Sequence, residues 1–150
     1  MPVLPRAAHD VARRLLFGLG AQAYDLLTGQ ALWRAQILRL LDHTPPAPGP
    51  LRVLDLGTGP GVSAFALAEA LPDSVVTGVD LSPRMIARAR AHHAQTFPHL
   101  RDVDFLVADA AALPFAPASF DLVTGHSFLY LLPDPVAVLR EARRDRKSVV

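Results

Sequence analysis

Short apolar runs alternate with amphipathic stretches over most of the chain. The apolar runs are rich in Val and Leu and bounded by Gly, Pro or Asp, which predicts buried strands. These strands are expected at 51–56, 75–79, 103–107 and in the last part of 112–123. The stretches between them space apolar side chains at helical intervals, which predicts helices at 62–71, 83–94 and about 134–144. Strands that alternate with helices predict an α/β fold with a parallel sheet.

The chain divides into three parts. Residues 1–50 are expected to hold two helices, at 7–19 and about 30–42, followed by the proline-rich linker 44–50. Residues 51–144 form the predicted α/β core, and 145–150 form a short tail. In the last helix of the core, we expect Val136, Leu139 and Ala142 to face inward.

A glycine-rich turn follows the first core strand. Gly57, Gly59 and Gly61 come directly after Asp55 and Leu56 and before the helix at 62–71. Glycine lets the backbone adopt positive φ and lets a ligand approach closely, and a strand–turn–helix unit of this kind presents a helix N-terminus to a ligand. An ordinary tight turn is the alternative interpretation.

The spacing of this turn bears on the ligand. Val62 stands where the third glycine of a dinucleotide-binding G-x-G-x-x-G turn is expected, which argues against a nicotinamide-dependent reductase. A carboxylate at Asp55 suits a ligand with an ammonium group better than a pyrophosphate, because like charges repel.

A second carboxylate, Asp80, ends the strand at 75–79. At the tip of a parallel strand it is placed to accept hydrogen bonds from both ribose hydroxyls. A cap on the next helix is the other possibility, but Ser82 and Pro83 already supply the N-cap and first helical residue.

Composition removes several function classes. The chain has 150 residues, 51% of them hydrophobic, a formal net charge of +1 and no cysteine. The sequence gives no sign of a polybasic surface, so a nucleic-acid partner is not expected. The lack of cysteine excludes disulfides and cysteine-based zinc sites. No apolar run approaches the roughly 20 residues that span a bilayer, so we expect a cytoplasmic protein.

Several linked motifs together resemble those of the class I S-adenosylmethionine (SAM)-dependent methyltransferases, and most closely the branch with ubiquinone- and menaquinone-biosynthesis enzymes. The matching segments are LDLGTGPG (54–61), GVDLSPRMIARAR (78–90), VADAAALPFAPASFDLV (107–123) and REARR (140–144). The resemblance implies a Rossmann-like, three-layer α/β/α fold with parallel strands in the order 3-2-1-4. Strands 5–7 of the family are missing from the sequence.

The same resemblance implies a set of residues for S-adenosyl-L-methionine. Asp55 orients the glycine loop or contacts the methionine amine, and Asp80 holds the ribose diol. Asp109 accepts from the adenine amine, and Ala110 N–H reaches a ring nitrogen. The remaining expected contacts are Gly57, Thr58, Gly59 and Gly61 around the methionine and ribose, Leu81 and Met85 beside the adenine, and Tyr24 from the N-terminal part.

Methyl transfer needs a base only if the acceptor keeps its proton. His126, just past the fourth strand, is the candidate base; the alternatives are a packing or hydrogen-bonding histidine and a contact to the methionine end of SAM. Phe128 and Tyr130 line an apolar acceptor pocket or belong to the core. The Asn/Asp-Pro-Pro-Tyr motif of many amine methyltransferases is absent, which favours a small-molecule acceptor. No metal is expected, since His92 and His93 are adjacent in a helix end and do not face one way.

The tail 145–150 reads Asp-Arg-Lys-Ser-Val-Val where the family continues into its fifth strand. These residues can be encoded by GATCGGAAGAGCGTCGTG, which resembles a sequencing adapter, so we expect a truncated reading frame with a non-native tail. Strand 4 is then an open edge with Leu122 and Val123 poorly covered. A native stop codon after Val150 in genomic DNA would contradict this expectation. A SAM-binding protein that transfers no methyl group is the alternative function.

Overall fold

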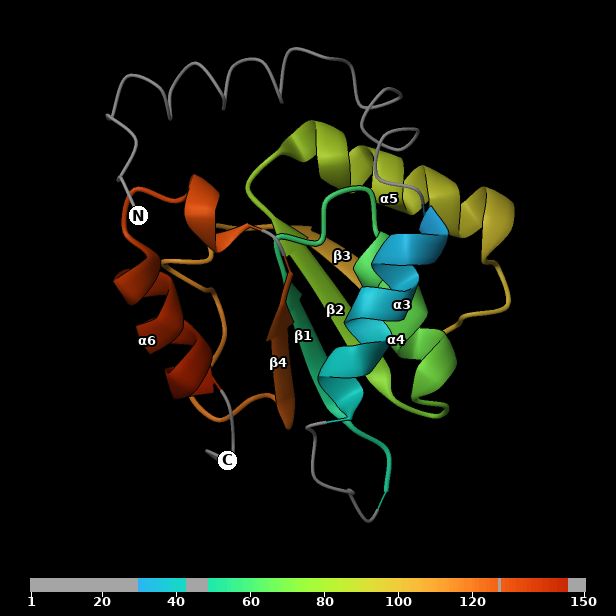
Figure 1. Cartoon of the computed structure of the whole chain (residues 1–150), viewed down its shortest axis with the longest axis horizontal. Helices are drawn as coiled ribbons and strands as arrows, with labels where there is room; N and C mark the ends of the chain where they lie inside the picture. The colour runs from blue at the N-terminus through green and yellow to red at the C-terminus, as the bar shows by residue number, and fades with distance from the viewer. Residues whose placement is uncertain (1–29, 43–48, 127, 146–150) are drawn as a thin grey trace.

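The computed structural model describes residues 30–42, 49–126 and 128–145, and these form one parallel sheet flanked by helices (Figure 1). The four strands are β1 (Arg52–Leu56), β2 (Val75–Asp80), β3 (Val103–Val107) and β4 (Leu122–Gly125). Their order is β3-β2-β1-β4, as predicted from the resemblance. In the register Asp55 lies opposite Gly78 on one side and Thr124 on the other. The central strand therefore carries a carboxylate with neighbouring strands on both sides.

Helices cover both faces of the sheet, which confirms the expected three layers. The helices are α3 (Gln30–Leu41), α4 (Val62–Ala70), α5 (Pro83–Thr96) and α6 (Pro135–Asp145), with a 3₁₀ turn η1 (Leu129–Leu131). Successive strand residues point to opposite faces, and the two faces of β1 take part in separate cores: Val53 in the first and Leu54 in the second. The predicted helix at about 30–42 is α3, whereas the predicted helix at 7–19 lies outside the described residues.

The first core lies between the sheet and the helices α3, α4 and α5. Ile37, Phe65 and Ile86, one from each helix, are each at most 2% exposed. Phe65 packs against the edge of Phe105 from β3, with ring centroids 5.5 Å apart, and stacks on Phe97 at 4.3 Å. This layer holds α4 and α5 rigidly on the sheet, and both helices begin at the candidate site.

The second core lies under α6, where the predicted inward face is right for Ala142, which packs against this core, and wrong for Val136 and Leu139. Val138 is 1% exposed and packs with Leu54 and Val79, whereas Val136 and Leu139 are more than half exposed. The reason is that α6 also meets the irregular segment between β3 and β4. Polar side chains of α6 bind this segment, so the helix turns a partly polar face inward.

The edge of the sheet at β4 has no further strand among the described residues. The expectation that Leu122 is poorly covered is wrong, because this side chain is 7% exposed and belongs to the first core. Val123 is half-buried beside the second core. Helix α6 runs through Asp145, one residue beyond the predicted end of the core. No helix in the part of the chain that the structure describes is long and apolar enough to cross a bilayer.

Candidate functional site

A cavity of about 450 Å³ opens at the carboxyl ends of the strands. Its walls come from the glycine turn after β1, the β2–α5 junction, the segment after β3 and the segment after β4. The lining residues are Gly57, Gly59, Val79, Asp80, Leu81, Ser82, Met85, Ala108, Asp109, Ala110, His126, Phe128, Tyr130, Leu131, Leu132 and Pro133. This volume lies within the range of about 300–1,000 Å³ that is typical of small-molecule sites.

The glycine turn adopts a conformation that ordinary residues avoid. Gly57, Gly59 and Gly61 have φ angles of 67°, 54° and 92°. The turn is anchored by a hydrogen bond from Thr58 N to Val79 O at 3.0 Å. Gly57 and Gly59 line the cavity, whereas Thr58 and Gly61 are buried behind it. A Cβ at Gly61 would lie 2.8 Å from the Phe65 ring, so this glycine serves packing as well as the turn.

Asp80 is the central polar group of the cavity. One carboxylate oxygen accepts a hydrogen bond from Gly59 N at 2.9 Å, and the other accepts from Ser82 N at 2.8 Å. Burial raises the pKa of the Asp80 carboxyl, while these two N–H groups act to lower it. The helix cap is provided separately, since Ser82 Oγ accepts from Met85 N at 3.4 Å and Pro83 begins α5. Asp80 thus joins the glycine turn to the start of α5.

Asp55 does not line the cavity. Its side chain is 1% exposed and lies on the face of β1 that α4 covers. It accepts hydrogen bonds from the hydroxyls of Ser63 and Thr124, the latter at 3.0 Å. Burial raises the pKa of Asp55, and the hydroxyl groups oppose this rise. This geometry is compatible with the first of the two predicted roles, in which Asp55 orients the glycine loop, because its hydrogen bonds join the end of β1 to α4 and β4 beneath the turn.

The segment after β3 brings Asp109 and Ala110 to the cavity wall opposite the glycine turn. Asp109 is exposed, and its Oδ1 accepts from Ala111 N at 2.8 Å, which leaves its other oxygen available to a ligand. Leu81 and Met85 lie on the wall formed by the start of α5. These four predicted residues are therefore brought together with Asp80.

The segment after β4 closes the cavity with apolar side chains. Phe128 packs directly on the backbone of Gly57 and Gly125. A Cβ built on either glycine would lie 2.6 Å from the Phe128 ring. Phe128 and exposed Tyr130 both line the cavity. His126 lies beside them, half-buried, and burial lowers its pKa. The predicted contact Tyr24 lies outside the described residues.

Two groups of residues were not predicted. Leu131, Leu132 and Pro133 complete the apolar wall, and only their position between the fourth strand and the last helix pointed to them. Ser63 and Thr124 are the partners of Asp55; their hydroxyls were visible in the sequence, but the register of β1 with β4 was needed to pair them.

His93 lies in the last turn of α5 and His92 just before it, and each contacts a backbone carbonyl. His92 Nδ1 is 3.3 Å from Pro60 O in the glycine turn, and His93 Nε2 is 2.6 Å from Leu100 O. Both rings are half-buried. Their contacts support the turn and the loop before β3.

Comparisons with known proteins agree with this architecture. A family profile described as "Methyltransferase domain" matches residues 53–147. Aklanonic acid methyltransferase DauC of Streptomyces sp. (strain C5) is 36% identical over 124 residues, which is 82% of this chain and 54% of that protein. Demethylmenaquinone methyltransferase of Thermotoga maritima is 35% identical over 135 residues, 86% of this chain and 54% of the relative. The chain thus spans about half the length of these curated relatives.

A solved structure supports the fold. It is a candidate S-adenosyl-L-methionine-dependent methyltransferase from Methanococcus maripaludis, with a TM-score of 0.74 at 21% identity, over 86% of this chain and 58% of that one. At this identity the likeness speaks for the fold alone.

Proposed function

The chain belongs to the class I SAM-dependent methyltransferases, in the branch of the menaquinone- and ubiquinone-type enzymes, and from this premise we propose that it binds S-adenosylmethionine in the cavity and transfers the methyl group to a small-molecule acceptor. The observation that carries the proposal is the position of Asp80. Its carboxylate lies in the cavity wall between the glycine turn and the start of α5.

Asp80 suits a ribose diol. Each of its oxygens accepts one backbone N–H and retains a lone pair. Two adjacent hydroxyls can donate to these lone pairs without displacing the existing bonds. The raised pKa of the carboxyl reflects burial, and two further donors would favour its charged form.

Each of the other walls contacts a different part of the ligand. Gly57 and Gly59 offer close backbone approach to the methionine and ribose, with Thr58 and Gly61 shaping the turn behind. Leu81 and Met85 supply apolar contact to the adenine, and Asp109 and Ala110 N–H supply polar contact to its edge. Asp55 acts as a positioning residue beneath the turn.

S-adenosylmethionine held by these residues would supply an activated methyl group, with sulfur keeping the electron pair of the broken C–S bond as the methyl carbon bonds to the acceptor atom. The protein's part is to align the acceptor with the methyl group and to exclude water. Where the acceptor carries a proton, neutral His126 takes it, because its lowered pKa keeps the imidazole unprotonated near neutral pH.

An apolar wall indicates the class of acceptor. Phe128, Tyr130, Leu131, Leu132 and Pro133 form one side of the cavity, which favours an apolar or aromatic molecule over nucleic acid. The name demethylmenaquinone methyltransferase of the relatives points the same way and suggests a reduced naphthoquinone as the first acceptor to test. A cytoplasmic location stays a prediction.

Calorimetry with S-adenosylhomocysteine tests the cofactor site. Asp80→Ala is expected to weaken binding by about 1.5–3 kcal/mol, as for hydrogen bonds to a charged group. The control Asp102→Ala removes an exposed carboxylate just before β3, at the opposite end of the strands, and should leave the affinity unchanged. Because Asp80 also braces the turn, each protein is measured with the 2′,3′-dideoxy analogue as well. Equal loss for both ligands in Asp80→Ala would remove the diol assignment.

Transfer of a labelled methyl group to a naphthoquinol or an extracted metabolite pool separates the two functional classes. Incorporation of label identifies an enzyme. Binding of S-adenosylhomocysteine without any incorporation would identify a SAM-binding protein that transfers no methyl group.

A further inference from the structure

The segment between β3 and β4 forms one wall of the cavity without regular secondary structure of its own. Residues 108–121 contain neither a helix nor an extended strand, yet Ala108, Asp109 and Ala110 must hold a defined shape to recognise a ligand. Backbone N–H and C=O groups in an irregular segment need partners from elsewhere. The position of this wall is therefore set by whatever binds its backbone.

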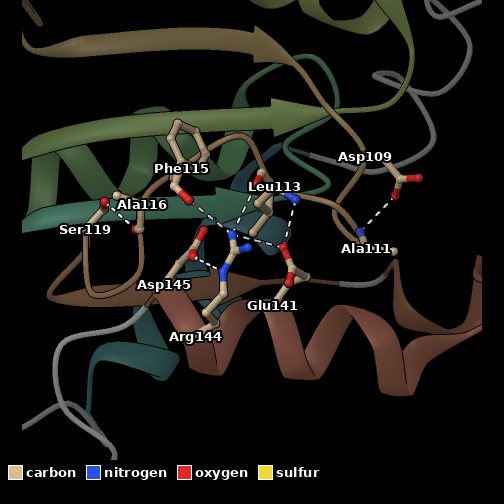
Figure 2. A network of polar contacts seen from close by, with 9 residues as sticks. All are labelled: Asp109, Ala111, Leu113, Phe115, Ala116, Ser119, Glu141, Arg144 and Asp145. Atoms are coloured by element: carbon tan, nitrogen blue, oxygen red, sulfur yellow. Dashed lines mark hydrogen bonds and ion pairs between the residues drawn. The ribbon is translucent and has the colours of Figure 1, made fainter.

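Helix α6 provides those partners through Glu141 and Arg144, and Arg144 also pairs with Asp145 (Figure 2). The Glu141 carboxylate accepts from Leu113 N at 2.9 Å, and the Arg144 guanidinium donates to Leu113 O at 3.1 Å and to Phe115 O at 3.2 Å. Arg144 Nη2 lies 3.0 Å from Glu141 Oε2. Both backbone groups of Leu113 are thus bound by the same pair of side chains.

Backbone contacts extend the same attachment toward β4. Ala118 N donates to Arg144 O and Phe120 N donates to Asp145 O, each at 2.9 Å. The C-terminal end of α6 therefore binds the segment at several residues. Figure 2 shows the side-chain contacts of this attachment.

A tight turn connects Leu113 to the cavity. Asp109 O accepts from Ala112 N at 3.0 Å, and Asp109 Oδ1 accepts from Ala111 N at 2.8 Å. The Leu113 side chain is 5% exposed and packs in the second core. Because the turn is closed by these hydrogen bonds, a shift of Leu113 moves Asp109 with it.

We propose that the Glu141–Arg144 pair is a positioning clamp that sets the adenine-reading wall of the site by holding Leu113, and so determines how well the protein distinguishes adenine from other purines. This inference rests on the proposed function. Neither side chain lines the cavity, so both act through the 109–113 turn. An ion pair with side chains 37% and 18% exposed adds little stability by itself; its importance lies in the backbone groups that it binds.

The test compares two ligands that differ at one edge of the base. S-adenosylhomocysteine carries the exocyclic amine and the acceptor N1 of adenine, whereas S-inosylhomocysteine carries a carbonyl oxygen and an N1–H donor, so the preference reports the contacts of Asp109 and Ala110 together. We expect the wild-type protein to prefer the first. Glu141→Ala should reduce that preference by about tenfold, the loss of one hydrogen bond to a charged group, with the affinity for S-inosylhomocysteine nearly unchanged.

Two controls separate positioning from general stability. Glu141→Gln keeps an acceptor oxygen for Leu113 N and should retain most of the preference. Glu69→Ala removes the ion pair with Arg34 between α3 and α4, on the other face of the sheet, and should leave the preference intact. If Glu141→Ala fails to fold, Glu141→Ser, a smaller polar residue that is too short to reach Leu113 N, replaces it with the same expectation; Arg144 is left unchanged because it also pairs with the buried Asp145 carboxylate.

The outcomes are distinct. A lower preference in Glu141→Ala that is rescued in Glu141→Gln supports the clamp. An unchanged preference, with both ligands weakened equally or not at all, overturns it and leaves the proposed function standing. A wild-type protein that binds no S-adenosylhomocysteine overturns the proposed function, and the clamp with it.

Discussion

Gly57 and Gly125, which contact Phe128, and Gly59, which does not, allow backbone strain and steric overlap to be measured separately. Gly59 has a φ of 54° and nothing within 4 Å of a built Cβ, so alanine there adds strain alone. Gly125 lies outside the positive-φ region, but its Cβ would meet Phe128 at 2.6 Å, so alanine there adds overlap alone. Gly57 combines a φ of 67° with a Cβ position 2.6 Å from the Phe128 ring.

These geometries set the expected losses of unfolding free energy. Left-handed backbone costs a non-glycine residue about 1–2 kcal/mol, and overpacking a filled site costs about 1–3 kcal/mol. Gly59→Ala should therefore lose about 1–2 kcal/mol, Gly125→Ala about 1–3 kcal/mol, and Gly57→Ala the sum of the two, about 2–5 kcal/mol. Urea unfolding, with the slope checked for constancy, measures each value.

Phe128→Ala makes the test a set of double-mutant cycles. Removing the ring removes the overlap, so Gly125→Ala should cost almost nothing in that background, and Gly57→Ala should cost only its strain. Gly59→Ala should cost the same with or without the ring. Additive losses at Gly57 and Gly125, within about 0.5 kcal/mol, would show that Phe128 does not lie against these glycines and would refute the reasoning.

Two further predictions concern titration. Burial raises the pKa of Asp55 above its ordinary value of 3.8, so its contribution to stability is full below that value and declines as pH rises through the folded-state pKa. In urea unfolding, the stability of the wild type relative to Asp55→Asn should therefore fall as pH increases; a constant difference would contradict this. For His126, whose pKa burial lowers, His126→Gln should reduce kcat with a naphthoquinol by about 10²–10⁴-fold and leave S-adenosylhomocysteine affinity unchanged. The acid limb of the wild-type pH–rate profile should lie below 6.5, the ordinary histidine pKa, and a limb that persists in His126→Gln would exclude the histidine as base.

Local sequence signals were sufficient for the elements that begin or end at the site. The apolar run before Asp55, the closely spaced glycines and the Ser82–Pro83 start of α5 each act within a few residues, and each was predicted correctly. The position of Asp80 in the cavity followed from a general property of parallel sheets, in which the carboxyl ends of the strands meet at one edge.

Local patterns in the sequence determined the strands and the helices of the core, because periodicity, glycine and proline constrain the backbone locally. The order of the strands came from the resemblance to the methyltransferase family, and the edge at which the cavity opens followed from the parallel sheet. Tertiary structure decided which way the polar groups face. Two roles stayed open for Asp55, orienting the glycine loop or contacting the methionine amine, and its side chain lies beneath the turn because the register of β1 and β4 and the docking of α4 bring Thr124 and Ser63 to it. Helix α6 was expected to bury Leu139, but the segment before β4 packs against Glu141 and Arg144 instead. Such choices depend on contacts between residues far apart in the chain, and a local pattern of apolar and polar positions does not contain them.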